Sequence, residues 1–92
     1  MYSITDYTYR QAKKIGVMVF PSERAAKKID VYDLEGNFLA SVGAKGYGDY
    51  PTFIILYGKQ YANERRRLYK QRHDADRHEM YSSGWLADQL LW

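Results

Sequence analysis

The sequence predicts an α+β fold, a small antiparallel β-sheet packed against a basic helix and a short C-terminal helix. Two apolar runs flank Glu35-Gly36-Asn37, a pattern typical of a β-hairpin, because Gly and Asn adopt the positive φ that tight turns need. From Lys59 onward the apolar residues recur with helical spacing. With 92 residues the chain has room for one core, so we expect an arm over 1–15 and a single domain over 16–92.

The predicted sheet has three strands. An apolar, β-branched run that ends at Pro21 predicts the first strand over 16–21, since proline lacks the N–H that a β-ladder requires. Alternating polar and apolar residues predict the second strand over 28–34. The third strand, over 37–43, follows the turn, so the second and third strands form the hairpin.

Two segments outside the strands have weaker patterns. Residues 1–15 follow neither a helical nor an alternating period, which predicts an irregular arm that becomes ordered against a neighbour. Residues 51–57 suit a strand by composition, or a helix that Pro51 opens at its first position, and Gly58 ends either element.

Two helices complete the predicted domain. The periodicity after Gly58 predicts a basic helix over about 60–75. The apolar segment 84–92 predicts a final helix that Ser82 or Ser83 caps. Its apolar residues lie on nearly every side, so we expect more than one face to be covered.

The net charge of +3 comes from one segment. Residues 58–78 hold seven Lys and Arg against three Asp and Glu, whereas the rest of the chain holds seven against eight. A helical projection places Arg66, Arg67 and Lys70 opposite the apolar arc, where they are candidate contacts to nucleic-acid phosphates. The alternative is a solvated helix face with intrahelical ion pairs.

The glycine-rich segment GAKGYGDYP, residues 43–51, matches no known phosphate-loop pattern. We therefore expect a crossover in which glycines allow close approach of the backbone. We expect Asp49 to accept hydrogen bonds from backbone N–H groups or from an arginine. Arg65 and Arg72 lie within the apolar arc of the basic helix, so either is the expected arginine. The residues expected to hold this part of the fold together are Gly43, Gly46, Gly48, Asp49, Arg65, Arg72, His73 and Trp85.

The sequence contains no pattern for catalysis, a metal or a cofactor. Without cysteine there is no thiol nucleophile or thiolate ligand, and the chain suits a reducing compartment inside a cell. His73 and His78 are five residues apart, which turns the two rings away from each other on a helix. No apolar run is long enough to span a membrane. We therefore expect a protein that is not an enzyme and has no small-molecule substrate.

Aromatic residues are the candidates for partner contacts. The chain has ten tyrosines, three phenylalanines and two tryptophans, and most are expected in the core or at its rim. Tyr2, Tyr7 and Tyr9 in the arm and Trp92 at the other end remain, so we expect these four to contact another protein.

Four motifs in order carry a resemblance to a known family: GAKGYGDY at 43–50, RRRLYKQRH at 65–73, SGW at 83–85 and LLW at 90–92. Together they are similar to a family of small proteins of large eukaryotic DNA viruses, chlorella-type algal viruses among them. The resemblance covers about residues 29–92. It implies a viral source rather than a particular activity.

A viral source favours a structural role. Short, cysteine-free, aromatic-rich viral proteins without a catalytic pattern are often components of the virus particle, so we expect a minor capsid or cement protein that binds major or minor capsid proteins. The alternative is a viral accessory protein that binds nucleic acid through the basic helix 59–73.

Overall fold

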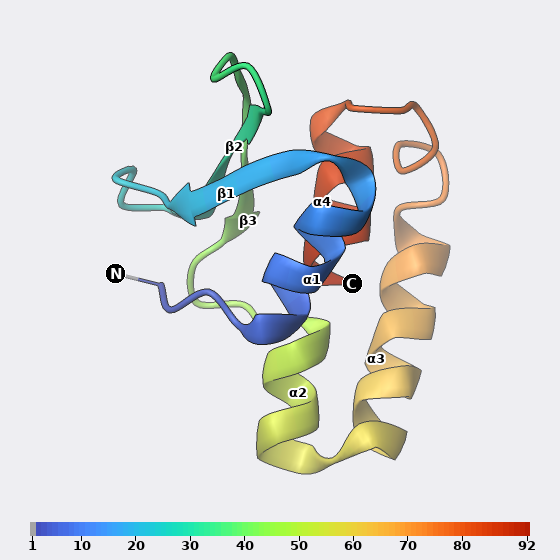
Figure 1. Cartoon of the computed structure of the whole chain (residues 1–92). Coiled ribbons are helices and arrows are strands. Elements are labelled where there is room, and N and C mark those ends of the chain that lie inside the picture. Colours follow the sequence, from blue (N-terminus) through green and yellow to red (C-terminus); the bar gives the residue numbers. More distant parts are fainter. Residues whose placement is uncertain (1) are drawn as a thin grey trace.

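A computed structural model describes residues 2–92 and confirms the α+β fold. Its sheet is antiparallel, and a helix lies at the C-terminal end as predicted. The elements in chain order are α1 (Asp6–Ile15), β1 (Val17–Pro21), β2 (Lys27–Asp33), β3 (Phe38–Ala44), α2 (Tyr50–Tyr57), α3 (Lys59–Arg72) and α4 (Ser83–Leu91) (Figure 1).

The sheet has the strand order β1-β2-β3, with each strand antiparallel to the next. All three strands lie within a residue of their predicted bounds. The hairpin turn forms as its residues require, because Asp33 Oδ1 accepts hydrogen bonds from the N–H groups of Glu35 and Asn37, both at 2.9 Å, and Gly36 has a φ of 91°. The register shifts between Val31 and Tyr32, which pair with Ala40 and Phe38, so Leu39 is an extra residue on β3.

The predicted irregular arm is wrong for residues 6–15, which form α1. Thr5 caps this helix through the N–H of Thr8, at 3.3 Å, and Gly16 ends it with a φ of 74°. The buried face carries Thr8 and Ala12, and the charged side chains of the segment are exposed. The segment is therefore amphipathic with a helical period, which the prediction of an irregular arm missed. Thr8 Oγ1 donates to the backbone oxygen of Leu90 at 2.8 Å, which joins α1 to α4.

The ambiguous segment 51–57 is helical. Asp49 is the N-cap of α2, and its Oδ1 accepts from the N–H of Thr52 at 3.0 Å, while Pro51 occupies the first turn. This is the arrangement that a proline at the start of a helix favours. Gly58 ends α2 with a φ of 90° and leads directly into α3.

The hydrophobic core lies between the sheet, α1 and α4. Figure 1 shows α2 and α3 side by side as a helical hairpin that extends away from the sheet. The fully buried apolar cluster contains no residue of that hairpin. Its members are Ala12, Val17, Val19, Ile29, Val31, Val42, Leu86, Leu90 and Leu91.

The helices predicted near the C-terminal end are present with shifted bounds. The basic helix ends at Arg72 rather than near 75, with His73 as its C-cap, and α4 begins at Ser83 with Ser82 as its N-cap. No helix among residues 2–92 combines the length and the apolar character that crossing a membrane requires.

Candidate functional site

A buried carboxylate joins three distant segments. Asp49 is fully buried, and its Oδ2 accepts hydrogen bonds from the Tyr2 hydroxyl at 2.6 Å and from Lys28 Nζ at 2.8 Å. Lys28 is itself buried in β2. Together with its capping bond to α2, Asp49 connects the N-terminal segment, the sheet and the helical hairpin.

The charge state of this cluster follows from its contacts. Burial by itself would raise the pKa of Asp49, but the hydrogen bond from Lys28, helped by Thr52 and Tyr2, outweighs burial and holds the pKa below its usual range. Burial and the neighbouring carboxylate raise the pKa of Tyr2. Asp49 is therefore ionised and neutralises Lys28.

The expected pairing of Asp49 with Arg65 or Arg72 is wrong, because its partner is Lys28. Helical spacing could not indicate the true partner, because Lys28 lies on a strand 21 positions before Asp49 in the chain. The available sequence signal for Lys28 was the alternation of polar and apolar residues in β2, which places Lys28 and Asp30 on the face opposite Ile29.

The basic helix is rotated relative to the prediction. Arg66 and Lys70, expected to face outward, lie on the side of α3 that contacts the rest of the protein. The Arg66 guanidinium lies 3.8 Å from the centre of the Tyr50 ring, and its NH1 donates to the backbone oxygen of Trp92 at 3.4 Å. Lys70 Nζ lies 2.8 Å from Asp88 Oδ1.

Arg67 does project outward, where it forms an exposed ion pair with Glu64 at 2.6 Å. Arg65 and Arg72, expected to face inward, are exposed. The rotation has a physical reason: the side of α3 that carries Arg66 and Lys70 faces an aromatic ring and a buried carboxylate, both of which attract cations.

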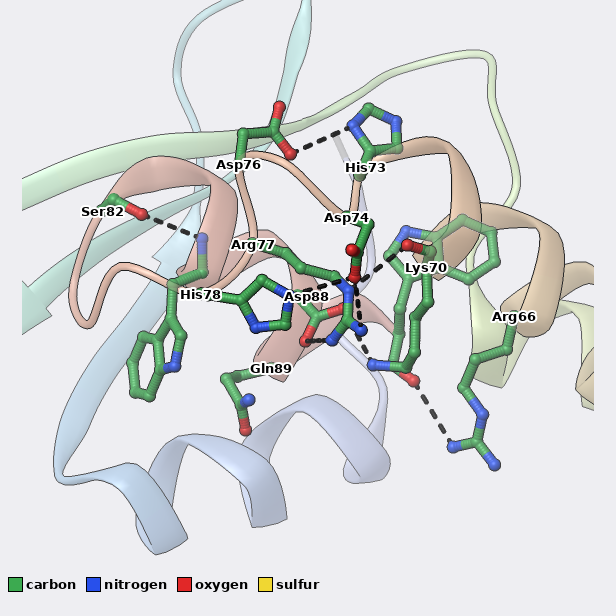
Figure 2. A network of polar contacts seen from close by, with 12 residues as sticks. Arg66, Lys70, His73, Asp74, Asp76, Arg77, His78, Ser82, Asp88 and Gln89 are labelled. Atoms are coloured by element: carbon green, nitrogen blue, oxygen red, sulfur yellow. Dashed lines mark hydrogen bonds and ion pairs between the residues drawn. The ribbon is translucent and has the colours of Figure 1, made fainter.

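A polar network joins α3 to α4 (Figure 2). Asp88 on α4 is buried and contacts both Lys70 and Arg77 NH1, the latter at 3.8 Å. Arg77 NH2 and His78 Nε2 both lie 3.0 Å from Asp74 Oδ1. His78 and Arg77 hold the pKa of Asp74 below its usual range. Among residues 2–92 no three His, Asp or Glu side chains are grouped so that they could hold a metal ion.

A cleft of about 540 Å³ lies between the glycine-rich loop, α3 and the end of α4. The sequence predicted that Arg65, Arg72 and His73 would point towards this loop, and all three line the cleft together with Gly43 and Gly48. We call it the basic cleft, and its main side chains are Tyr47, Arg65, Tyr69, Arg72, His73 and Trp92.

Glycines set the position of the loop in the basic cleft. A Cβ at Gly43, whose φ is 80°, would lie 2.6 Å from Leu91 Cδ1, and one at Gly48 would overlap the Phe53 ring. Gly46 has a φ of 90° with open space around it, so its role is conformational. The loop therefore lies directly on α2 and α4.

Gly84 and Trp85 fix the start of α4. A Cβ at Gly84 would overlap the backbone oxygen of Asp76, so only glycine allows this loop to approach the helix. The backbone N–H of Trp85 donates to Ser82 Oγ at 3.2 Å, and the Trp85 ring packs against the core.

Most aromatic residues expected to contact a partner make contacts within the chain. Tyr2 binds Asp49, Tyr7 has its ring 5.5 Å from that of Tyr50, and Trp92 stacks on Tyr69 with ring centres 4.3 Å apart. Tyr9 alone among the four is classed as exposed.

A different apolar surface is exposed at the turn between α2 and α3. All residues from 55 to 61 are exposed, and the exposed fractions of Ile55, Leu56 and Tyr57 are 74, 62 and 62%. The Tyr57 and Tyr61 rings lie 4.8 Å apart beside them. We call Ile55, Leu56, Tyr57 and Tyr61 the apolar corner.

The sequence contained a signal for this surface. Residues 53–57 are apolar on every side of a helix of two turns, followed by Gly58, and so short a helix has no room to bury all its faces.

Comparisons of the chain with protein-family models, with curated proteins and with solved structures found no match. Its function is therefore inferred from the geometry described above.

Proposed function

We propose that this protein is a non-enzymatic structural protein that binds another protein through the apolar corner. The observation that carries the proposal is the exposure of Ile55, Leu56 and Tyr57 as three consecutive large apolar residues. Contiguous apolar side chains on the surface of a small protein mark sites of protein contact, because water-exposed apolar area is buried favourably on binding.

The shape of the fold supports this role. Figure 1 shows the α2–α3 turn at the far end of the helical hairpin, away from the sheet and from α1 and α4. A partner can approach this end without contacting the core elements. Tyr57 and Tyr61 add ring area and hydroxyl groups, which makes them suitable interface anchors.

The resemblance to proteins of large DNA viruses supports a particular partner class. We propose that the apolar corner contacts a major or minor capsid protein, so that the chain acts as a minor capsid or cement protein in virus particles assembled inside the host cell. A small protein with an apolar projection suits the joint between larger subunits.

Binding of nucleic acid through Arg66, Arg67 and Lys70 has less support. Arg66 and Lys70 are held against Tyr50 and Asp88, and Arg67 is paired with Glu64. Three cations that already have partners form a weak footprint for phosphates.

Incorporation into virus particles tests the proposal. The variant Ile55→Lys/Leu56→Lys replaces two exposed side chains near the end of α2, where the helix dipole favours cations, so it should fold normally. We expect its abundance in purified particles, measured by quantitative mass spectrometry, to fall at least about tenfold, because a charged corner no longer buries apolar area.

The matched control is Leu34→Lys/Met80→Lys, which changes two equally exposed apolar residues elsewhere. It should be incorporated like the original chain. Absence of the original protein from particles, or equal incorporation of both variants, contradicts the proposal. Analytical ultracentrifugation separates a second copy from a capsid partner: dimerisation that only Ile55→Lys/Leu56→Lys abolishes would assign the corner to self-association and overturn a capsid partner.

A further inference from the structure

We propose that the basic cleft binds a nucleotide unit, with the phosphate on Arg65 and Arg72 and the base against the aromatic side of the cleft. This site is separate from the apolar corner and does not depend on the proposed function. The argument rests on charge, on the aromatic lining and on size.

The first step is the charge of the basic cleft. Arg65 and Arg72 are seven residues apart on α3, so both lie on one face with a rise of about 10 Å between them. Neither side chain forms a hydrogen bond or an ion pair with any residue from 2 to 92, although the Arg65 guanidinium lies 5.5 Å from the Phe53 ring centre. No Asp or Glu lines the cleft.

The other arginines on and just after α3 do have hydrogen-bond or ion-pair partners. Arg66 donates to a backbone oxygen, Arg67 pairs with Glu64, and Arg77 contacts Asp74 and Asp88. Lys28 also lines the cleft, but Asp49 neutralises it. Among the arginines from 65 to 77, the two without such partners are Arg65 and Arg72, and both face the same cleft, where a phosphate can accept paired hydrogen bonds from them.

The second step is the aromatic side of the cleft. The rings of Tyr69 and Trp92 are stacked almost in parallel, at an interplanar angle of 9°, and the His73 ring stacks on Tyr69 with centres 4.4 Å apart. Across the cleft, Tyr47 on the glycine-rich loop is 76% exposed. Flat rings beside cations are the surfaces on which nucleobases stack.

The third step is size. A volume of about 540 Å³ lies within the range of small-molecule sites, roughly 300–1,000 Å³. A phosphate alone would occupy a small part of it, whereas a phosphate with its sugar and base would reach from the arginines to the aromatic rings. A nucleotide is therefore the ligand class that uses both parts of the lining.

Binding measurements with two probes test this inference. Isothermal titration with adenosine 5′-monophosphate and fluorescence anisotropy with a short labelled oligothymidylate distinguish a free nucleotide from a single strand. Both are run at about 0.15 M salt, where charges farther apart than about 8 Å are screened. We expect saturable binding of at least one probe, and Arg65→Gln/Arg72→Gln should weaken it at least about tenfold.

The matched control is Lys59→Gln/Arg67→Gln, which removes two exposed cations from the same helix outside the cleft. It should leave the affinity within about twofold, since screening limits the effect of distant charges. Tyr47→Ala, a change of an exposed ring, should weaken the nucleotide but not inorganic phosphate.

The outcomes separate clearly. Binding of the monophosphate alone assigns the cleft to free nucleotides, binding of the oligonucleotide alone assigns it to a single strand, and binding of both supports a shared nucleotide unit. Three results would overturn the inference. The first is no binding of either probe, and the second is an equal loss of affinity in Arg65→Gln/Arg72→Gln and in the control Lys59→Gln/Arg67→Gln. The third is displacement of the nucleotide by inorganic phosphate at the same concentration. Circular dichroism of each variant confirms folding.

Discussion

At the scale of single residues, Asp49 makes the most consequential contacts in the protein. It is a buried anion that accepts hydrogen bonds from a lysine, a tyrosine hydroxyl and a backbone N–H of three different segments. A buried charge is tolerated only when its partners are in place, because removing it from water costs several kcal/mol. Asp49 and Lys28 thus depend on each other.

Replacing Asp49 by alanine should strongly destabilise the fold. The change leaves Lys28 Nζ buried without a counter-ion and removes the N-cap of α2, so we expect a loss of about 3 kcal/mol or more in the free energy of unfolding. Urea denaturation measures it. Glu23→Ala, at an exposed acidic residue, is the control, and an unchanged midpoint for Asp49→Ala would contradict the assigned role.

The pH dependence of stability tests the same carboxylate. The pKa of Asp49 is lowered in the folded protein, so its contribution is complete above the unfolded value of about 3.9 and is lost as the pH falls further. We expect the unfolding free energy of the original chain to fall more steeply below about pH 4 than that of Asp49→Asn. Equal slopes for the two proteins would contradict a lowered pKa.

At the scale of elements, α3 is held largely by polar and aromatic contacts. Ala62 is its one buried residue, and the side that faces the protein carries Arg66 and Lys70. The ion pair with Asp88 on α4 therefore attaches α3 to the rest of the protein, a role that an apolar stripe has in an ordinary amphipathic helix. This explains why hydrophobic periodicity predicted the helix and misplaced its faces.

Lys70→Met should loosen α3. The change leaves the buried Asp88 with Arg77 as its remaining cation, at 3.8 Å, and we expect a loss of about 1–3 kcal/mol in the free energy of unfolding. Lys59→Met, at an exposed position on the same helix, should change it by less than about 0.5 kcal/mol. Chemical denaturation of both variants provides the comparison, and equal effects would show that the ion pair contributes nothing specific.

At the scale of the whole molecule, the chain has an apolar part and a polar extension. The buried cluster lies between α1, the sheet and α4, whereas the hairpin of α2 and α3 joins them through Asp49, Asp88 and aromatic contacts. Ring pairs such as Phe53 with Trp92, whose centres are 6.0 Å apart, line that junction. Both candidate binding surfaces lie on the extension or at its junction.

Hydrogen exchange should separate the two parts. Amides in α2 and α3 should exchange through a local opening at a lower free energy than amides in β2, because the hairpin buries less apolar area and its ion pairs weaken in salt. Added salt should widen the difference. Equal protection throughout residues 2–92 would show that the hairpin and the core unfold as one unit.

Local patterns predicted most of the secondary structure and part of the site. The three strands, the turn at Gly36 and the basic helix all follow from spacing and turn residues that neighbours in sequence determine. The gathering of Arg65, Arg72 and His73 at the glycine-rich loop was also predicted, because a seven-residue spacing places Arg65 and Arg72 on one face of the helix and His73 directly follows Arg72. The apolar corner was not predicted, although the apolar residues on every side of the short helix α2 were a signal for it.

What the sequence by itself determined is therefore the set of elements and their turns, which depend on interactions a few residues apart. What only the tertiary structure decided is the packing of α1 on α4, the rotation of α3 and the partner of Asp49. Each depends on a contact between distant segments: Thr8 with Leu90, Lys70 with Asp88 and Lys28 with Asp49. In all three contacts the partner of a polar group is determined by which groups lie near it in the folded protein, and hydrophobic periodicity does not encode that proximity.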